Sequence, residues 1–199
     1  MDFLHALLTI FGIFWLALAL RPKDRTVWLA ENVLTVGTVV ALLLTASRWP
    51  LTPLAYGLIV AFLVLHTIGA YFTYVRVPYD ETFRWLFGTE INKPFGWVRN
   101  HYDRLVHFSY GLLIAYPFYE LFERYAQPLP GWSYFFSVMF IMATSMIFEV
   151  FEWWAAALLS KGAGAAYVGA QGDEWDAQKD MALATLGAIL TMAFTAAAS

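Results

Sequence analysis

Residues 132–159 read WSYFFSVMFIMATSMIFEVFEWWAAALL, and this stretch decides the class of fold. It contains no Lys or Arg, and its only acids are Glu149 and Glu152. A helix needs about 20 mostly apolar residues to cross the hydrocarbon core of a bilayer. The stretch therefore predicts a transmembrane helix, and its two carboxylates need a reason to be there, because ionised groups in a bilayer are costly.

The composition extends this assignment to the whole chain. Apolar residues make up 60% of the 199 positions and charged residues 14%, with a mean hydropathy of +0.58. A soluble domain usually carries roughly 25% charged residues. Comparable apolar stretches are Phe3–Leu20, Val27–Ala46, Pro53–Val75, Leu105–Phe122 and Ala177–Ala198. We therefore expect an all-α fold, a polytopic transmembrane bundle of about six helices that residues 1–199 form as a single domain.

Charge and cysteine content exclude several classes of partner and chemistry. The formal net charge is −3, and no basic stripe is present that could neutralise phosphates. We therefore expect no nucleic-acid partner. Because the chain has no Cys, disulfides, thiolate metal sites and cysteine nucleophiles are excluded.

The distribution of Lys and Arg predicts the topology. Loops that should face one side carry most of the basic residues, namely Arg21, Lys23, Arg25, Arg76, Arg84, Lys93, Arg99 and Lys161. Loops on the other side hold only Arg48 and Arg124. By the positive-inside rule the basic loops are cytoplasmic and both termini are external. The first apolar stretch is expected to remain as a helix, since its basic residues follow it, the reverse of a signal peptide.

Two long connections are expected on the cytoplasmic side. Residues 76–102 combine Pro and Gly with many aromatic side chains, which is typical of a segment that lies in the membrane interface. Residues 160–175 include the Gly-rich run Gly162–Gly172 that leads into a group of acids. Glycines allow a loop to approach a site closely, and a flexible linker explains the run equally well.

Polar residues recur at helical spacing on three of the expected helices. The stripes are Asp103, His107 and Tyr110; Ser145, Glu149 and Glu152; and Asp173, Asp176 and Asp180. In each stripe the side chains share one helix face. The last stripe continues through Ala184 and Gly187, small residues that let membrane helices approach closely. We therefore expect this face of the last helix to pack inward.

The depths of these groups predict one shared site. At 1.5 Å per residue, His107 and Asp180 lie about 6 Å inside the cytoplasmic face, and Glu149 and Glu152 about 10–15 Å inside it. His66, on another apolar stretch, falls at a similar depth. The predicted metal ligands are His107, Glu149, Glu152, Asp173, Asp176, Asp180, Asp103 and His66. Such a site would open toward the cytoplasm.

Simpler structural roles compete with this interpretation. Asp173 and Asp176 stand at a helix start, where acids cap the helix and complement its dipole. Asp103 could pair with a neighbouring Arg, and His66 could be a core histidine bonded to a backbone carbonyl. Glu149 is harder to explain in this way, because its neighbours in sequence are apolar and offer no counter-charge.

Three motifs resemble a known family. They are RNHYDRLVHFSYGLL at Arg99–Leu113, FEVFEWW at Phe148–Trp154 and GDEWDAQKDM at Gly172–Met181. They resemble the YjdF-like proteins of the bacterial inner membrane, a family of unknown function, and imply the same compartment. The order of a His-Phe pair, a Glu-centred helix and an Asp-x-x-x-Asp pair is more distantly similar to VanZ-like membrane proteins. The Gln and Asn that accompany the acids in that family have no counterpart here, so its activity is not carried across.

Three classes of function remain open. One histidine with carboxylates is a ligand set for Zn, Mn, Fe or Mg, and such an ion could activate water against a lipid head group or a polyprenyl phosphate. In such an enzyme Glu149, Glu152 and Tyr110 are the candidate catalytic residues, and the partner is a membrane lipid. The alternatives are a proton- or cation-coupled transporter, for which inverted repeats are not apparent, and a non-catalytic scaffold with a structural polar core. Among them we favour a divalent-cation site, with catalysis as an extension of it, and the sequence leaves the substrate, the metal and the oligomeric state open.

Overall fold

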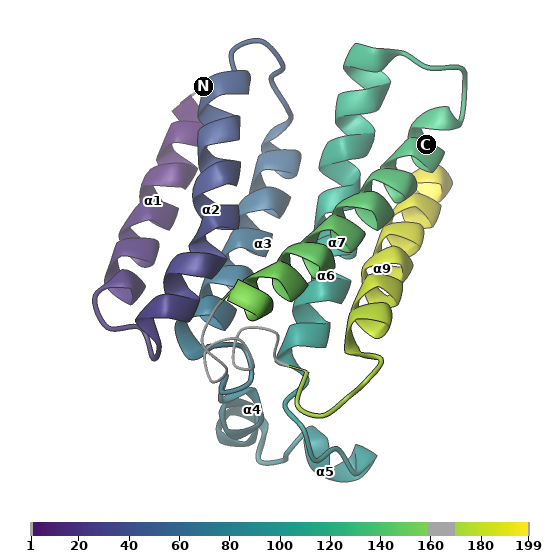
Figure 1. Ribbon diagram of the computed structural model, residues 1–199. Helices are drawn as coiled ribbons and strands as arrows, with labels where there is room; N and C mark the ends of the chain where they lie inside the picture. Colours follow the sequence, from purple (N-terminus) through teal and green to yellow (C-terminus); the bar gives the residue numbers. More distant parts are fainter. Residues whose placement is uncertain (1, 159–169, 199) are drawn as a thin grey trace.

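The computed structural model describes residues 2–158 and 170–198, and it is built from helices throughout this described part (Figure 1). The long helices are α1 (Asp2–Ala19), α2 (Arg25–Thr45), α3 (Pro53–Phe72), α6 (Tyr102–Leu121), α7 (Trp132–Leu158) and α9 (Asp176–Ala198). Their positions confirm the predicted all-α fold. By length and composition α2, α3, α7 and α9 can each cross a membrane, and α1 is a shorter apolar helix.

The long helices form two groups that meet at one contact. In the first group α1 and α2 pack against α3, and in the second α6, α7 and α9 pack against one another. The contact between α3 and α6 joins the two groups (Figure 1). Helix α6 therefore lies at the centre of the bundle, and its neighbours shield the polar residues that it carries.

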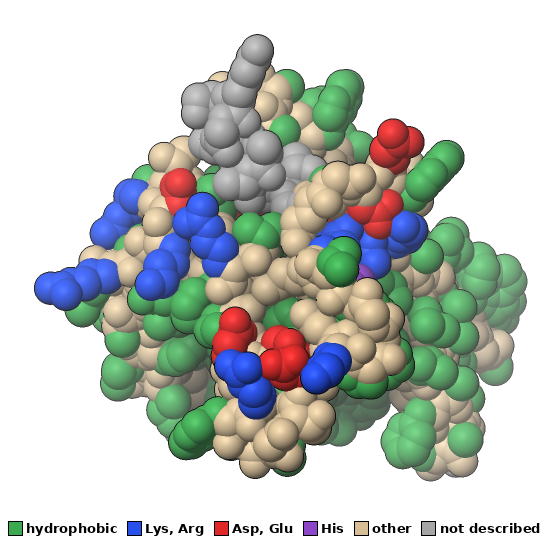
Figure 2. Space-filling view, turned by 90° about the horizontal axis from the view of Figure 1, so that it is seen from below, with side chains coloured by type: hydrophobic (Ala, Val, Ile, Leu, Met, Phe, Trp, Pro, Cys, Tyr) green, Lys and Arg blue, Asp and Glu red, His purple; other side chains and the backbone are tan. Residues whose placement is uncertain are grey.

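Both termini lie at one end of the bundle, and the connections with most of the basic residues lie at the other (Figure 1). Seen from that second end, Lys and Arg side chains gather around the helix ends together with acids (Figure 2). Both termini lie at the same end because the described chain has an even number of long helices, each of which crosses the bundle once. This arrangement agrees with the predicted topology, in which this basic face is cytoplasmic.

The segment predicted as an aromatic interfacial loop contains two short helices, α4 (Tyr79–Phe87) and α5 (Asn92–Phe95). Acids at the start of α4 complement its dipole, and Gly88 ends it with a φ of 74°. The carboxylate of Asp80 accepts hydrogen bonds from the backbone N–H groups of Ile91 and Asn92, which ties the two helices together. Neither helix has a buried residue. Large apolar side chains are exposed here, including Trp85, Leu86, Phe87 and Phe95, as expected for an interfacial segment.

Helices α6 and α9 run in the same direction and approach each other very closely. A Cβ added to Gly111 would lie 1.8 Å from the carbonyl oxygen of Ala184, and one added to Gly187 would lie 2.3 Å from that of Phe108. Ala184 is fully buried. The prediction that the small residues of the last helix pack inward is confirmed.

Candidate metal centre

Three helices bring four ionisable side chains together near the basic end of the bundle. Asp103 and His107 lie one turn apart on α6, Asp180 comes from α9 and Glu149 from α7. One ligand atom from each of Asp103, His107 and Asp180 lies within 4.8 Å of the other two. The Nε2 atom of His107 is 3.6 Å from Asp103 Oδ1 and 3.6 Å from Glu149 Oε1. The group of Asp103, His107, Glu149 and Asp180 is called the His/carboxylate cluster below.

The close approach of α6 and α9 sets the register of this cluster. Gly111 lies against Ala184, and both helices rise in the same direction from the basic end (Figure 1). One turn below this contact, His107 therefore comes beside Asp180. A larger residue at Gly111 would push the helices apart and separate the two side chains.

Two oxygens of the cluster are buried without a hydrogen-bond partner. Within the described residues Glu149 Oε1 and Asp180 Oδ1 accept no hydrogen bond, although their side chains are almost completely buried. Glu120, a buried acid at the opposite end of α6, behaves differently. Its carboxylate accepts bonds from the backbone N–H and the hydroxyl of Thr52 and from Arg124, at 2.6–2.7 Å. A fully paired acid needs no cation, whereas the unpaired oxygens of the cluster suit one.

Glu152 extends the acidic region away from His107. Its side chain is buried on α7, 7% exposed, and no ion pair is formed by it within the described residues. It lies within electrostatic reach of four other acids, Asp103, Glu149, Glu31 and Asp180. Glu152 therefore stands next to the cluster as a buried carboxyl group that no ion pair holds within the described residues.

Asp173 and Asp176 are held by basic side chains. Asp176 Oδ1 accepts a hydrogen bond from Arg99 at 2.7 Å, and Arg104 pairs closely with Asp173. Lys179 adds bonds to both Asp173 oxygens at 2.6 and 2.9 Å. The bond from Lys179, with that from the backbone N–H of Trp175, lowers the pKa of Asp173 below its ordinary range. These pairs anchor the start of α9 to the segment before α6, and they place Asp173 outside the His/carboxylate cluster.

Asp176 lies between the basic side chains that hold Asp173 and the His/carboxylate cluster. Its Oδ1 atom binds Arg99, and its charge also reaches Asp103 and His107 on the neighbouring helix. A nearby residue, His101, stands at the basic end beside Arg104. Partial burial, Arg104 and Arg99 together lower the pKa of His101.

His66 belongs to a separate network with a residue that the sequence analysis missed. Its Nδ1 atom is 2.5 Å from the hydroxyl of Tyr74, and its Nε2 atom is 3.1 Å from the backbone carbonyl of Glu31. Glu31 is 1% exposed on α2, and neither of its carboxylate oxygens has a hydrogen-bond partner in the described chain. An acid inside the apolar stretch 27–46 is itself the signal that could have found it.

Tyr110 hydrogen-bonds to Thr144 of α7 and not to the ionisable side chains of the cluster. Its hydroxyl hydrogen-bonds to Thr144 Oγ1 at 2.6 Å, about one turn above His107 on the same face of α6. Ser145, on the stripe of Glu149 and Glu152, is buried, and its hydroxyl has no partner among the described residues. Tyr110 therefore orients α7 against α6 above the cluster.

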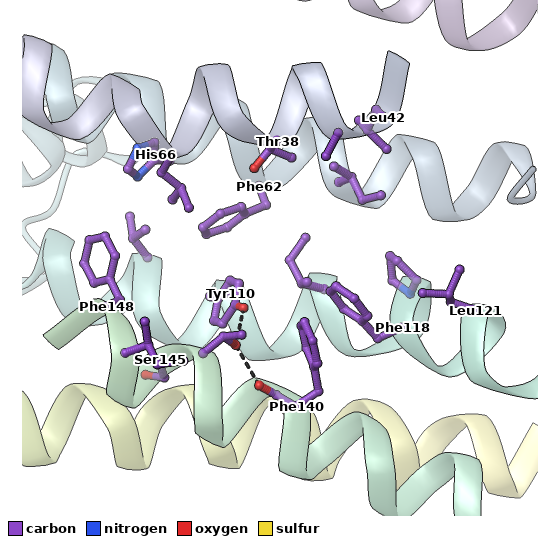
Figure 3. Close-up of a pocket in the computed structure, with 18 of the residues that line it drawn as sticks. Thr38, Leu42, Phe62, His66, Tyr110, Phe118, Leu121, Phe140, Ser145 and Phe148 are labelled. Atoms are coloured by element: carbon purple, nitrogen blue, oxygen red, sulfur yellow. Dashed lines mark hydrogen bonds between the residues drawn. The ribbon is translucent and has the colours of Figure 1, made fainter. Parts of the chain in front are cut away.

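A cavity of about 510 Å³ begins at the cluster and continues between the two helix groups (Figure 3). Its polar end is formed by His66, Tyr74, Asp103 and His107. The remaining lining is almost entirely apolar and comes from α2, α3, α6 and α7. The volume lies within the range of small-molecule binding sites.

Comparison with known proteins places the chain among bacterial membrane proteins. The model of a family described as predicted membrane protein (DUF2238) matches residues 3–199. Inner membrane protein YjdF of Escherichia coli (strain K12) is 38% identical over 178 residues, which are 89% of this chain and 81% of that protein. No solved structure gives a significant match. The resemblance to YjdF-like proteins and the multi-pass inner-membrane location are confirmed, and the similarity to VanZ-like proteins stays a prediction.

Proposed function

The chain belongs to the DUF2238 family of predicted membrane proteins, and we propose that it binds one divalent cation in the His/carboxylate cluster and acts on the polar group of a membrane lipid. One observation carries the proposal. Ligand atoms of Asp103, His107 and Asp180 lie within 4.8 Å of one another, and buried oxygens of Glu149 and Asp180 have no hydrogen-bond partner among the described residues. A single cation between them would neutralise these carboxylates.

The donor set limits the metal. One imidazole and three carboxylates are hard to borderline ligands, which suit Zn, Mn, Fe or Mg. Copper(I) prefers sulfur ligands, which the cysteine-free cluster does not contain. Asp103, His107 and Asp180 lie close together, and Glu149 lies at the edge of this group. This arrangement leaves a coordination position for a water or a substrate oxygen, as in catalytic metal sites.

The side chains divide into three roles in this proposal. Asp103, His107, Asp180 and Glu149 hold the cation, which when bound polarises a phosphoryl or carbonyl oxygen and makes its water more acidic. Glu152 accepts the proton of that water, because it is buried beside Glu149 and free of ion pairs in the described chain. The arginine pairs with Asp173 and Asp176 fix α9 so that Asp180 stays in reach of His107.

Elemental analysis of the detergent-purified protein tests the proposal. We expect about one Zn, Mn, Fe or Mg per chain, and we expect Asp180→Asn and His107→Ala to remove it. Glu120→Gln is the matched control, because Glu120 is an equally buried acid whose partners are Thr52 and Arg124. Metal-free protein after purification and after dialysis against each of the four ions would overturn the proposal.

The second network favours a second candidate function, proton-coupled transport. Glu31, His66 and Tyr74 form a buried chain of titratable groups beside the cluster, in which both oxygens of Glu31 lack a hydrogen bond among the described residues and Oε2 lies 4.0 Å from His66 Nε2. Buried acids and histidines in membrane proteins often relay protons. A pH-sensitive dye inside proteoliposomes separates the two functions. Proton flux that Glu31→Gln abolishes supports transport, whereas bound metal without proton flux supports the enzyme.

A further inference from the structure

The cavity that starts at the His/carboxylate cluster is nearly as long as the bilayer core is thick. It reaches from Asp103 at one end of α6 to Leu121 at the other, which corresponds to about 27 Å along the helix. The hydrocarbon core of a bilayer is about 30 Å thick. The cavity is therefore elongated along α6, and it is called the channel below.

The lining changes from polar to apolar along the channel. Among the described residues of the lining, the acid and histidine side chains all lie at the basic end, where Asp103, His107 and His66 contribute to the wall. Beyond them the wall consists mainly of side chains such as Leu42, Ile59, Phe62, Ile114, Phe118 and Phe140. The rings of Phe62 and Tyr110, whose centroids are 5.2 Å apart, contact each other and both line the channel at mid-height (Figure 3). The hydroxyls of Tyr110 and Thr144 hydrogen-bond to each other there, which leaves few hydrogen-bonding groups for water.

The channel reaches the lipid-facing surface along its side. Ile147 and Phe151 of α7 line it and are 47% and 55% exposed, so the cavity is open along this helix. Helices α2 and α7, which form its two edges, are not among the closely packed helix pairs of the described chain. A chain could therefore enter sideways from the bilayer without crossing water.

From these observations we propose that the channel holds a single long hydrocarbon chain of a membrane lipid, with an anionic phosphate head at the His/carboxylate cluster. Apolar cavities do not retain water, which needs two to four polar partners, and an empty channel forfeits the dispersion contacts of its wall. Lipid chains are the abundant apolar molecules around the protein. The proposal rests on the function proposed above for the head group, because the phosphate oxygens are drawn to the cluster by its cation.

Two lipid sources share this chemistry, a phospholipid with one acyl chain in the channel and a polyprenyl phosphate. Native mass spectrometry of delipidated protein distinguishes them when the protein is incubated with phosphatidylglycerol vesicles in one arm and with a polyprenyl monophosphate in the other. We expect about one lipid per chain in at least one arm. The arm that binds identifies the source.

Plugging the channel tests where the lipid binds. Thr38 and Ala41 of α2 line the channel, so Thr38→Phe and Ala41→Phe fill it. Val33 and Leu44 lie on the same helix but are 74% and 75% exposed on its outer face, so Val33→Phe and Leu44→Phe are matched controls. We expect each plug to reduce bound lipid at least tenfold and the controls to leave it unchanged. Equal retention in plugs and controls, or no lipid in either arm, would overturn the channel proposal.

Asp180→Asn separates this proposal from the cation site. It is expected to remove the metal and to weaken binding of the phosphate lipid, while a neutral lipid of the same chain, such as a polyprenyl alcohol, still enters the channel. If the native protein contains no metal but binds lipid in a plug-sensitive way, the channel stands and the cation site fails. If metal is bound and plug-sensitive lipid is not found, the cation site stands and the channel proposal fails.

Discussion

Gly111 of α6 lies so close to Ala184 of α9 that a single added Cβ would overlap the Ala184 carbonyl oxygen at 1.8 Å. The obstacle is backbone, which cannot move aside as a flexible side chain can. This contact fixes the register that brings His107 and Asp180 together one turn below. Stability and the candidate site therefore depend on the same helix pair.

The first prediction follows from this contact. Gly111→Ala should destabilise the protein by about 2–3 kcal/mol or more, because overpacking against a rigid neighbour forces the two helices apart. Gly57 on α3 is the control, since a Cβ there would meet nothing within 4 Å. Gly57→Ala should be neutral or stabilise by up to about 1 kcal/mol through helix propensity. Denaturant unfolding in detergent, followed by circular dichroism, measures both, and equal effects would contradict the packing argument.

The second prediction compares two buried acids in opposite surroundings. Glu120 accepts three hydrogen bonds, whereas Glu31 accepts none at its carboxylate within the described residues. Glu120→Gln should cost about 1.5–3 kcal/mol, the range of hydrogen bonds to charged groups. Glu31→Gln should be neutral or stabilising, because it removes a buried carboxylate that accepts no hydrogen bond within the described residues and whose Oε2 atom approaches His66 Nε2 only to 4.0 Å. A loss of stability in Glu31→Gln as large as that in Glu120→Gln would contradict this and show that the contact with His66 stabilises the fold.

Local sequence patterns predicted much of the architecture. Apolar stretches such as Pro53–Val75 located the long helices to within a few residues, because spanning length is a strong constraint. Helical spacing placed His107 and Asp180 on inward faces, and counting residues from the helix ends put them at one depth. Each of these inferences needs only the geometry of a single helix.

The features that the sequence did not predict depend on contacts between helices. The pairing of Arg99 with Asp176 requires the irregular segment before α6 to fold back against the start of α9, and no spacing rule contains that turn. The channel exists because α2 and α7 stay apart, which is a property of the whole bundle. Glu31 is different. Its position within an apolar stretch was visible in the sequence, and only its place beside His66 required the structure.

The third prediction concerns pH. Lys179 and the backbone N–H of Trp175 lower the pKa of Asp173 in the folded protein below the ordinary aspartate value of about 3.9. A group with a depressed folded pKa contributes stability above its unfolded pKa and loses that contribution as the pH falls through the folded pKa. The melting temperature should therefore decline below about pH 4, and less steeply in Asp173→Asn. Melting curves in detergent from pH 3 to pH 7 test this, and parallel declines in both proteins would contradict it.

The fourth prediction is the orientation in the membrane. Reporter fusions after Arg25 and Gly88 should give cytoplasmic signals, and a fusion after Ser199 should give a periplasmic one. The reason is the excess of Lys and Arg in the connections at the α4 end of the bundle, compared with Arg48 and Arg124 at the other end. A cytoplasmic signal at Ser199 would invert the bundle and place the His/carboxylate cluster near the periplasm.

The last prediction concerns removal of the metal. A cation that binds only the folded protein stabilises it by RT ln(1 + [L]/Kd), which is about 2.7 kcal/mol at a hundredfold excess over Kd. A chelator should therefore lower the melting temperature of the native protein and have little effect on Asp180→Asn or Glu149→Gln, because these variants lose a ligand of the proposed site. Glu120→Gln, whose acid is paired with Thr52 and Arg124 at the other end of α6, should respond to the chelator as the native protein does. If the chelator shifts none of the four proteins, then protons rather than a metal neutralise the cluster. In that case the network of Glu31, His66 and Tyr74 and the His/carboxylate cluster would together form one path for protons.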